Sequence, residues 1–180
     1  MQVLPNPIVL IGFKHVGKSV IGKSLAKKLC VPFIDLDQKI EILYEKQFSK
    51  KSTCRQIMQE NGEKFFRDLE MNALSDVIEA QPSIISLGGG TPLAAENQKM
   101  LKSCIVVHIT APREIVFERI RMSGQPAFFN PKEDLLDSFN TLWNEREKIY
   151  EKIKSFMIEN NGSVDEAVSK ITKKLPRKFA

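Results

Sequence analysis

The segment from Gly12 to Ser19 matches the pattern GxxxxGK[ST] at every defined position. It follows a short apolar run, Ile8–Ile11, and precedes a stretch with helical periodicity, which is the context in which this pattern forms a phosphate-binding loop. Glycines permit the tight turn that points backbone N–H groups at a phosphate, and the helix N-terminus adds partial positive charge there. The sequence therefore predicts a P-loop that binds a nucleoside triphosphate.

Individual positions of this loop have distinct chemical roles. The ammonium group of Lys18 can reach the β- and γ-phosphates, and the hydroxyl of Ser19 can bind Mg²⁺. The sequence therefore predicts Mg²⁺ beside the nucleoside triphosphate, with Lys18 acting in catalysis. The residues expected to contact the nucleotide here are Gly12, Phe13, Lys14, His15, Val16, Gly17, Lys18, Ser19 and Val20.

Apolar runs alternate with amphipathic stretches along the chain, which is typical of a parallel α/β sheet. Val20, Leu25 and Leu29 are expected to form much of the apolar face of the first helix. The predicted strands are Ile8–Ile11, Pro32–Asp35, Ile84–Leu87, Ile105–Ile109 and Ser155–Ile158. The predicted helices are Lys18–Cys30, two or three within residues 37–80, Pro112–Met122, Ser138–Ile153 and Ser163–Leu175.

These elements predict one domain over residues 1–180, with helices on both faces of a five-stranded parallel sheet in a three-layer α/β/α arrangement. Residues 122–132 contain a glycine and two prolines after the fourth predicted strand and are expected to form a lid. A GTPase would need an NKxD motif and a DxxG switch, and the sequence contains neither. A small-molecule kinase fits this organisation better.

The formal net charge is +5, and the basic residues are spread along the chain rather than interleaved with aromatic residues. This favours a small anionic ligand over nucleic acid. The three cysteines lack CxxC spacing, and the two histidines are far apart, which argues against a zinc site and for reduced thiols in the cytoplasm. No apolar stretch approaches the ~20 residues of a membrane helix, and no signal peptide is expected. We expect a monomer.

Asp35 and Asp37 follow the second predicted strand, and ligands of open α/β sheets bind beyond the carboxyl ends of the strands. Carboxylates at this place can hold Mg²⁺ or accept the proton of an attacking hydroxyl. The alternative is that Asp37 only caps a helix that starts at Gln38.

Arginines and glycines further along the chain suit an acidic acceptor. Arg67 lies on a predicted helix beside aromatic residues, and Arg146 lies on the helix that follows the expected lid. An arginine fork matches the geometry of a carboxylate. Gly88, Gly89 and Gly90 follow the third strand, where glycines permit close approach of the backbone to a ligand or simply a tight turn.

Taken in order, these motifs resemble those of the shikimate kinase family, which is related to the nucleoside monophosphate kinases. The resemblance covers nearly the whole chain. Its motifs are the P-loop, DxD at Asp35 and Asp37, GxxxFR from Gly62 to Arg67, GGG from Gly88 to Gly90, and Glu145-Arg146 with Tyr150.

The resemblance implies a phosphotransfer from ATP to the 3-hydroxyl of shikimate in the biosynthesis of chorismate and aromatic amino acids. It implies that Asp37 binds this hydroxyl and acts as its base, and that Asp35 and Ser86 lie in the outer shell of Mg²⁺. Arg67, oriented by Glu70, and Arg146 would bind the shikimate carboxylate, with the glycine loop contacting ring hydroxyls through the N–H of Gly89. Arg119 would stack on adenine, and Asn161 would belong to the loop that closes over this base.

The sequence departs from the family pattern most clearly in the lid. The family carries an arginine before a proline there, whereas this chain has Gln125 before Pro126. An arginine that stabilises a transferring phosphoryl group contributes about 10³–10⁵ in rate. Arg121, Lys132 or Lys14 could supply the charge instead, or the lid could act only by excluding water. The P-loop also has His15 where the family favours glycine and Val20 where it favours threonine.

Two alternatives to a shikimate kinase remain at this point. A related P-loop kinase would phosphorylate another small polyhydroxy acid, such as gluconate. A regulatory module that has lost catalysis would bind ATP tightly without releasing ADP in response to an acceptor.

Overall fold

The computed structural model describes residues 6–123 and 134–176 and has a five-stranded sheet at its centre. All strand pairs are parallel, and the strand order is β2-β3-β1-β4-β5. The five predicted strands are confirmed, each with ends within one residue of the expected position. The strands are β1 (Ile8–Ile11), β2 (Phe33–Asp35), β3 (Ile84–Ser86), β4 (Ile105–Thr110) and β5 (Phe156–Glu159).

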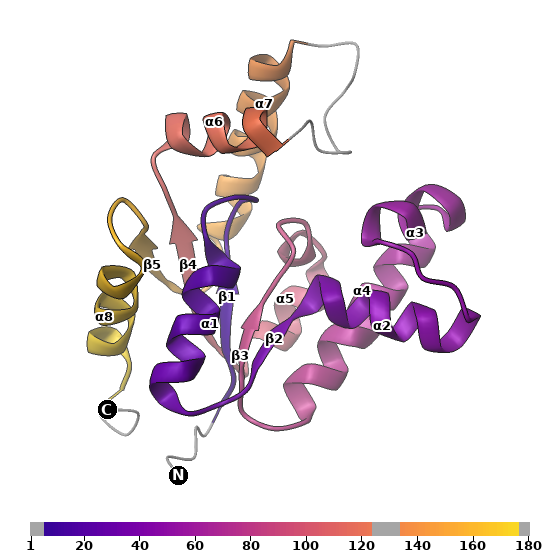
Figure 1. Ribbon diagram of the computed structural model, residues 1–180, viewed down its shortest axis with the longest axis horizontal. Coiled ribbons are helices and arrows are strands. Elements are labelled where there is room, and N and C mark those ends of the chain that lie inside the picture. The colour runs from indigo at the N-terminus through magenta and orange to yellow at the C-terminus, as the bar shows by residue number, and fades with distance from the viewer. Residues whose placement is uncertain (1–5, 124–133, 177–180) are drawn as a thin grey trace.

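Helices cover both faces of this sheet, which confirms the predicted three-layer α/β/α arrangement. Helices α1 and α8 pack together on one face, and α4 and α5 pack together on the other (Figure 1). The helices are α1 (Lys18–Leu29), α2 (Leu36–Phe48), α3 (Cys54–Asn61), α4 (Glu63–Glu79), α5 (Ala95–Leu101), α6 (Arg113–Ser123), α7 (Leu135–Tyr150) and α8 (Val164–Lys174), with a 3₁₀ turn, η1, at Thr91–Leu93.

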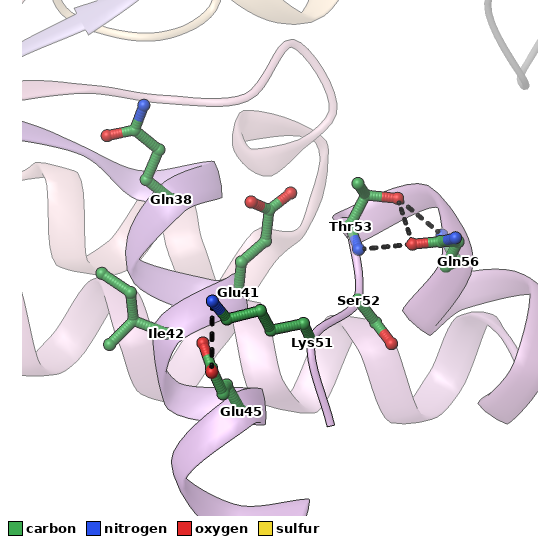
Figure 2. A pocket seen from close by; sticks show the side chains of 8 residues that line it. All are labelled: Gln38, Glu41, Ile42, Glu45, Lys51, Ser52, Thr53 and Gln56. Carbon is green, nitrogen blue, oxygen red and sulfur yellow. Dashed lines mark hydrogen bonds and ion pairs between the residues drawn. The ribbon is translucent and has the colours of Figure 1, made fainter. Parts of the chain in front are cut away.

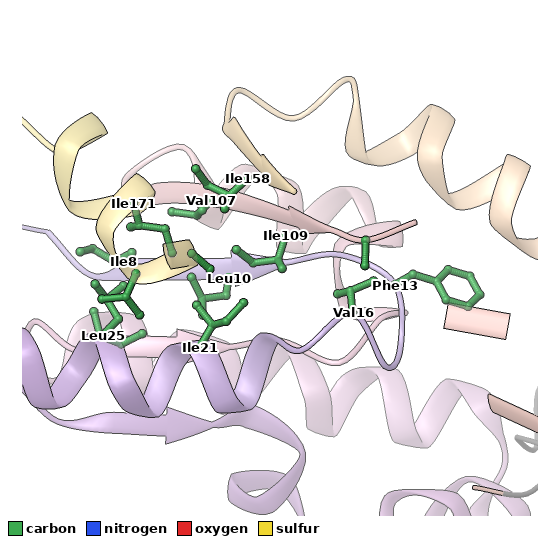
Figure 3. Close-up of a cluster of buried hydrophobic side chains, with 14 of the residues drawn as sticks. Ile8, Leu10, Phe13, Val16, Ile21, Leu25, Val107, Ile109, Ile158 and Ile171 are labelled. Atoms are coloured by element: carbon green, nitrogen blue, oxygen red, sulfur yellow. The ribbon is translucent and has the colours of Figure 1, made fainter. Parts of the chain in front are cut away.

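The alternation of side chains along β1 divides the core into two layers. Ile8 and Leu10 face the cluster formed with α1 and α8 (Figure 3), whereas Val9 and Ile11 face the cluster formed with α2 and α4. All four side chains are fully buried. Burial of each such side chain contributes about 1.5–3 kcal/mol, so both layers hold the central strand in place.

Two local expectations were wrong, and one helix was missed. Val20 is 58% exposed, because the buried face of α1 follows the spacing of Ile21, Leu25 and Leu29, each one turn apart. Helix α7 begins at Leu135 rather than Ser138, since Asp134 caps it by accepting hydrogen bonds from the next turn. Helix α5 was not predicted; it has seven residues and no side-chain cap, so it leaves little local signal.

The three helices α2, α3 and α4 fill the interval between β2 and β3, as the sequence predicted, and α3 projects to one side of the sheet (Figure 1). Helix α2 begins directly after β2, with Asp35 as its N-cap. The side chain of Asp35 accepts a hydrogen bond from the backbone N–H of Asp37 at 3.2 Å. The alternative in which Asp37 caps a helix from Gln38 is therefore wrong, and the Asp37 side chain is available for other contacts.

Within residues 6–123 and 134–176, no helix combines the length and the apolar character needed to cross a bilayer.

Candidate active site

The P-loop joins β1 to α1 and encloses the side chain of Lys18. Gly17 precedes the helix with φ of 100°, a left-handed conformation that favours glycine. The ammonium group of Lys18 donates hydrogen bonds to the carbonyls of Gly12 (2.9 Å) and Phe13 (2.8 Å). Burial lowers the pKa of Lys18 to about 8, although Asp37 and Asp35 raise it in part. A bound phosphate would place a further negative charge beside this buried ammonium and so compensate for its desolvation.

Two side chains from distant segments hold the P-loop from outside. Arg119 of α6 donates a hydrogen bond to the carbonyl of His15 at 2.9 Å, and Asn160 donates one to the carbonyl of Val16, also at 2.9 Å. His15 adopts a positive φ of 65°, which is uncommon outside glycine, so the contact with Arg119 helps to retain an unfavourable backbone angle. The loop geometry thus depends on α6 and on the residue after β5.

Side-chain oxygen atoms of Ser19, Asp35 and Ser86 lie close together where β2 and β3 end beside the P-loop. The hydroxyl of Ser19 donates to the Asp35 carboxylate at 2.8 Å and lies 3.4 Å from the hydroxyl of Ser86. Hard oxygen ligands suit Mg²⁺, which is usually held by one or two carboxylates together with water and substrate phosphates. The described residues contain no group of three or more His, Cys, Asp and Glu side chains that could hold a metal by themselves. The hydroxyls of Ser19 and Ser86 and the carboxylate of Asp35 are oxygen ligands of the type that Mg²⁺ binds.

Asp37 lies in the first turn of α2, next to the glycine loop. Its carboxylate is so close to Gly88 that a Cβ atom there would come within 2.7 Å of Oδ1. Desolvation by the surrounding protein, and next the charge of Asp35, raise the pKa of Asp37 to about 6, against the opposing effect of Lys18. A carboxylate with this pKa is suited to accept a proton near neutral pH.

Two arginines approach neighbouring residues of the glycine loop from different helices. A Cβ atom on Gly90 would lie 3.2 Å from both terminal nitrogens of Arg67, and one on Gly89 would lie 3.3 Å from Nη1 of Arg146. Arg67 is held by Glu70 at 2.9 Å, and Glu70 also accepts a hydrogen bond from Thr91 at 2.8 Å. The two guanidinium groups therefore converge on one loop.

Arg146 is also fixed by its surroundings. Its side chain is buried, and the guanidinium carbon lies 5.1 Å from the centre of the Phe13 ring in the P-loop. Burial and the nearby charge of Arg67 lower the pKa of Arg146. A buried cation beside a second cation favours a bound anion.

Known proteins of one family are similar to this chain over most of its length. The family model "Shikimate kinase" matches residues 14–176. A shikimate kinase of Bacillus subtilis (strain 168) is 36% identical over 179 residues, covering 97% of this chain and 91% of the relative. The structure of shikimate kinase from Acinetobacter baumannii in complex with shikimate superposes with a TM-score of 0.80 at 27% identity, covering 95% of this chain and 96% of that one.

The chain belongs to the shikimate kinase family. This is a family of ATP-dependent kinases. A gluconokinase from Sinorhizobium meliloti also superposes, with a TM-score of 0.53 at 14% identity over 94% of both chains, and this match shows the shared fold alone.

The structure brings together most of the site residues that the sequence predicted for a shikimate kinase. Asn161 is different: its side chain donates to Glu159 at 2.8 Å, and the adjacent Asn160 contacts the P-loop instead. The sequence analysis missed Asn160, although its place at the carboxyl end of β5 was a usable signal. Gln125, Pro126 and Lys132 lie outside the described residues.

A surface pocket of about 430 Å³ lies between α2 and the loop that leads into α3 (Figure 2). None of the predicted site residues lines it. Its link to the site is Glu41, which accepts a hydrogen bond from the backbone of Cys54 and helps to raise the pKa of Asp37. The lining residues are Gln38, Glu41, Ile42, Glu45, Lys51, Ser52, Thr53 and Gln56.

Proposed function

We propose that this protein transfers the γ-phosphoryl group of ATP to the 3-hydroxyl of shikimate, giving shikimate 3-phosphate and ADP. The observation that carries this proposal is the contact between the glycine loop and the P-loop. A Cβ atom on Gly89 would lie 3.4 Å from the backbone nitrogen of Lys14 and 3.3 Å from Arg146. The arginine proposed to bind the carboxylate and the backbone proposed to bind phosphate thus lie beside one residue, as a transfer between ATP and a small acid requires.

In this mechanism, Asp37 accepts the proton of the attacking hydroxyl and holds that oxygen in line with the γ-phosphorus. Lys18 leaves its carbonyl partners and donates to the β- and γ-phosphates, where negative charge develops during transfer. Arg67 and Arg146 hold the carboxylate of the acceptor, so that the ring presents one hydroxyl to Asp37.

Mg²⁺ would be held by the hydroxyl of Ser19, with the Asp35 carboxylate and the hydroxyl of Ser86 bonding to its water ligands. When bound, the ion neutralises charge on the phosphate oxygens. The contacts of Ser19 with both groups support this assignment, because they already place the three oxygen atoms together.

The remaining assignments complete this proposal. Within the helical region 37–80, Asp37 and Arg67 would bind the acceptor, and Arg119 and Asn161 would contact adenine. Most of the expected lid, residues 122–132, lies outside the described residues. The protein is proposed to be a monomer. A cytoplasmic location is supported by the three free cysteines, Cys30, Cys54 and Cys104.

Acceptor-dependent release of ADP tests the proposed reaction directly. In a coupled assay with MgATP, we expect ADP release with shikimate and little with gluconate or quinate. Preference for gluconate would instead identify a kinase of another polyhydroxy acid. ATP binding without acceptor-dependent ADP release would identify a regulatory module.

Substitution of the arginine pair tests the carboxylate clamp. Arg67→Ala and Arg146→Ala should each raise KM for shikimate by about 10- to 150-fold, because each removes charge-assisted hydrogen bonds worth about 1.5–3 kcal/mol. KM for ATP should change much less. Arg55→Ala, which removes an exposed arginine on α3, is the matched control and should leave both constants unchanged. Equal losses for both substrates would contradict the clamp.

Lys14 is the best-placed described substitute for the family's lid arginine. Its charge is close enough to lower the pKa of Lys18, whereas Arg121 is paired with Glu118 at 2.9 Å on the exposed side of α6. We expect Lys14→Ala to lower kcat by about tenfold, a modest effect because the exposed charge is screened. Arg121→Ala should leave kcat near wild type. The reverse order in steady-state kinetics would exclude Lys14 from this role.

A further inference from the structure

Tyr150, the last residue of α7, is buried against the glycine loop. Its side chain is 0% exposed, and its ring meets the His108 ring edge-on with centroids 5.2 Å apart. Its hydroxyl donates a short hydrogen bond of 2.6 Å to the carbonyl oxygen of Gly89. Burial raises the pKa of this phenol well above its usual value, so the hydroxyl keeps the proton that it donates.

This hydrogen bond fixes the peptide group between Gly89 and Gly90. The peptide bonds of the described residues are all trans, and in a trans peptide the C=O and N–H bonds point in opposite directions. Anchoring the carbonyl of Gly89 on Tyr150 therefore directs the N–H of Gly90 away from α7. Glycine has no side chain to restrain its backbone, so this peptide would otherwise rotate easily.

The same helix turn also supplies Arg146. Residues four apart lie on one face of a helix, so Tyr150 and Arg146 both project toward the loop. Arg146 lies beside Gly89, while Arg67 lies beside Gly90 from the other helix. The orientation of this one peptide therefore sets how backbone donors are presented between the two guanidinium groups.

We propose that Tyr150 is a positioning residue for the acceptor: its hydroxyl fixes the Gly89–Gly90 peptide and so orients the N–H of Gly90, which the loop offers to the substrate's hydroxyl groups beside that of Gly89. Tyr150 acts through Gly89 and does not touch the substrate. This role rests on the proposed function, and the experiment below separates the two.

The test is Tyr150→Phe, which removes one oxygen atom and keeps the ring. KM for shikimate should rise about three- to tenfold, the loss expected for one hydrogen bond, and KM for ATP should stay within about twofold of wild type. Tyr44→Phe is the matched control, because Tyr44 is the only other tyrosine and its hydroxyl accepts a hydrogen bond from Asn61 at the end of α3.

Amide hydrogen exchange of residues 88–90, followed by mass spectrometry of the full chain, gives a readout that does not depend on activity. Exchange should be faster in Tyr150→Phe and unchanged in Tyr44→Phe. Unaltered exchange, equal increases in KM for both substrates, or the same kinetic change in the control would each overturn the role of Tyr150. If the wild type releases no ADP with shikimate, the proposed function fails, while the exchange result still decides whether Tyr150 anchors the loop.

Discussion

Asp37→Asn is expected to lower kcat by about 10²- to 10⁴-fold, the usual contribution of a positioned general base. Asparagine has nearly the same shape and still contacts the acceptor hydroxyl, but it cannot accept the proton. KM for ATP should change little, because Asp37 lies beside Gly88 rather than inside the P-loop. Steady-state kinetics with each substrate varied in turn measures both constants.

The pH dependence of kcat/KM for shikimate serves as a control for the assignment of Asp37 as the base. Because the pKa of Asp37 is about 6, kcat/KM for shikimate should fall tenfold per pH unit below about pH 6 in the wild type. This decline should be absent in Asp37→Asn. An unchanged acid limb in the variant, or a kcat near that of the wild type, would show that Asp37 is not the base.

Although Asp37→Asn should lower activity, it should make the folded protein more stable at neutral pH. The pKa of Asp37 is raised by folding, so the cost of ionising it is absent below the unfolded value of 3.8 and complete above about pH 6. Asp37→Asn should therefore raise the free energy of unfolding at neutral pH by about 1 kcal/mol. This figure is reduced because residue 37 as a whole is exposed, so water still screens the carboxylate that the surrounding protein partly desolvates. At pH 4 this gain should disappear, as urea denaturation at the two pH values would reveal.

Lys18→Met is expected to lower kcat by about 10²- to 10³-fold and to weaken ATP binding. The ammonium is the buried charge that the P-loop offers to the phosphates, and removal of a preorganised electrostatic group costs rate on this scale. Methionine fills a similar volume, so the fold should be retained. Isothermal titration with ATP and single-turnover kinetics separate the binding effect from the chemical effect.

Lys23→Met on the same helix is the matched control, because Lys23 is exposed and belongs to no predicted site. A loss of activity in both variants would indicate a general effect on α1 rather than a role of Lys18 in transfer. Full activity in Lys18→Met would contradict the proposed mechanism.

Much of the fold could be predicted because its signals are local. Each strand is a short apolar run, and the P-loop pattern defines a turn whose glycines and lysine are consecutive in the sequence. Asp35 and Asp37 were placed correctly at the end of β2, since parallel strands end at the same edge of the sheet. These features need no knowledge of distant contacts.

Features that depend on contacts between distant segments were not predicted. Asn160 donates a hydrogen bond to the carbonyl of Val16, 144 positions away in the sequence. Its place at the carboxyl end of β5 indicated a site residue, but not this partner. Tyr150 was recognised only as part of a motif, whereas its hydrogen bond to Gly89 depends on the packing of α7 beside the glycine loop. Val20 is exposed although it was expected to be buried, so the buried face of a single helix cannot be predicted unless its rotation about its axis is known.

Identification of the phosphorylated product tests the central claim most directly. After incubation with MgATP and shikimate, ³¹P NMR and mass spectrometry should detect a monophosphate ester at the 3-hydroxyl of shikimate, formed in equal amount with ADP. ADP without a shikimate phosphate ester, or efficient esterification of gluconate but not shikimate, would contradict the account.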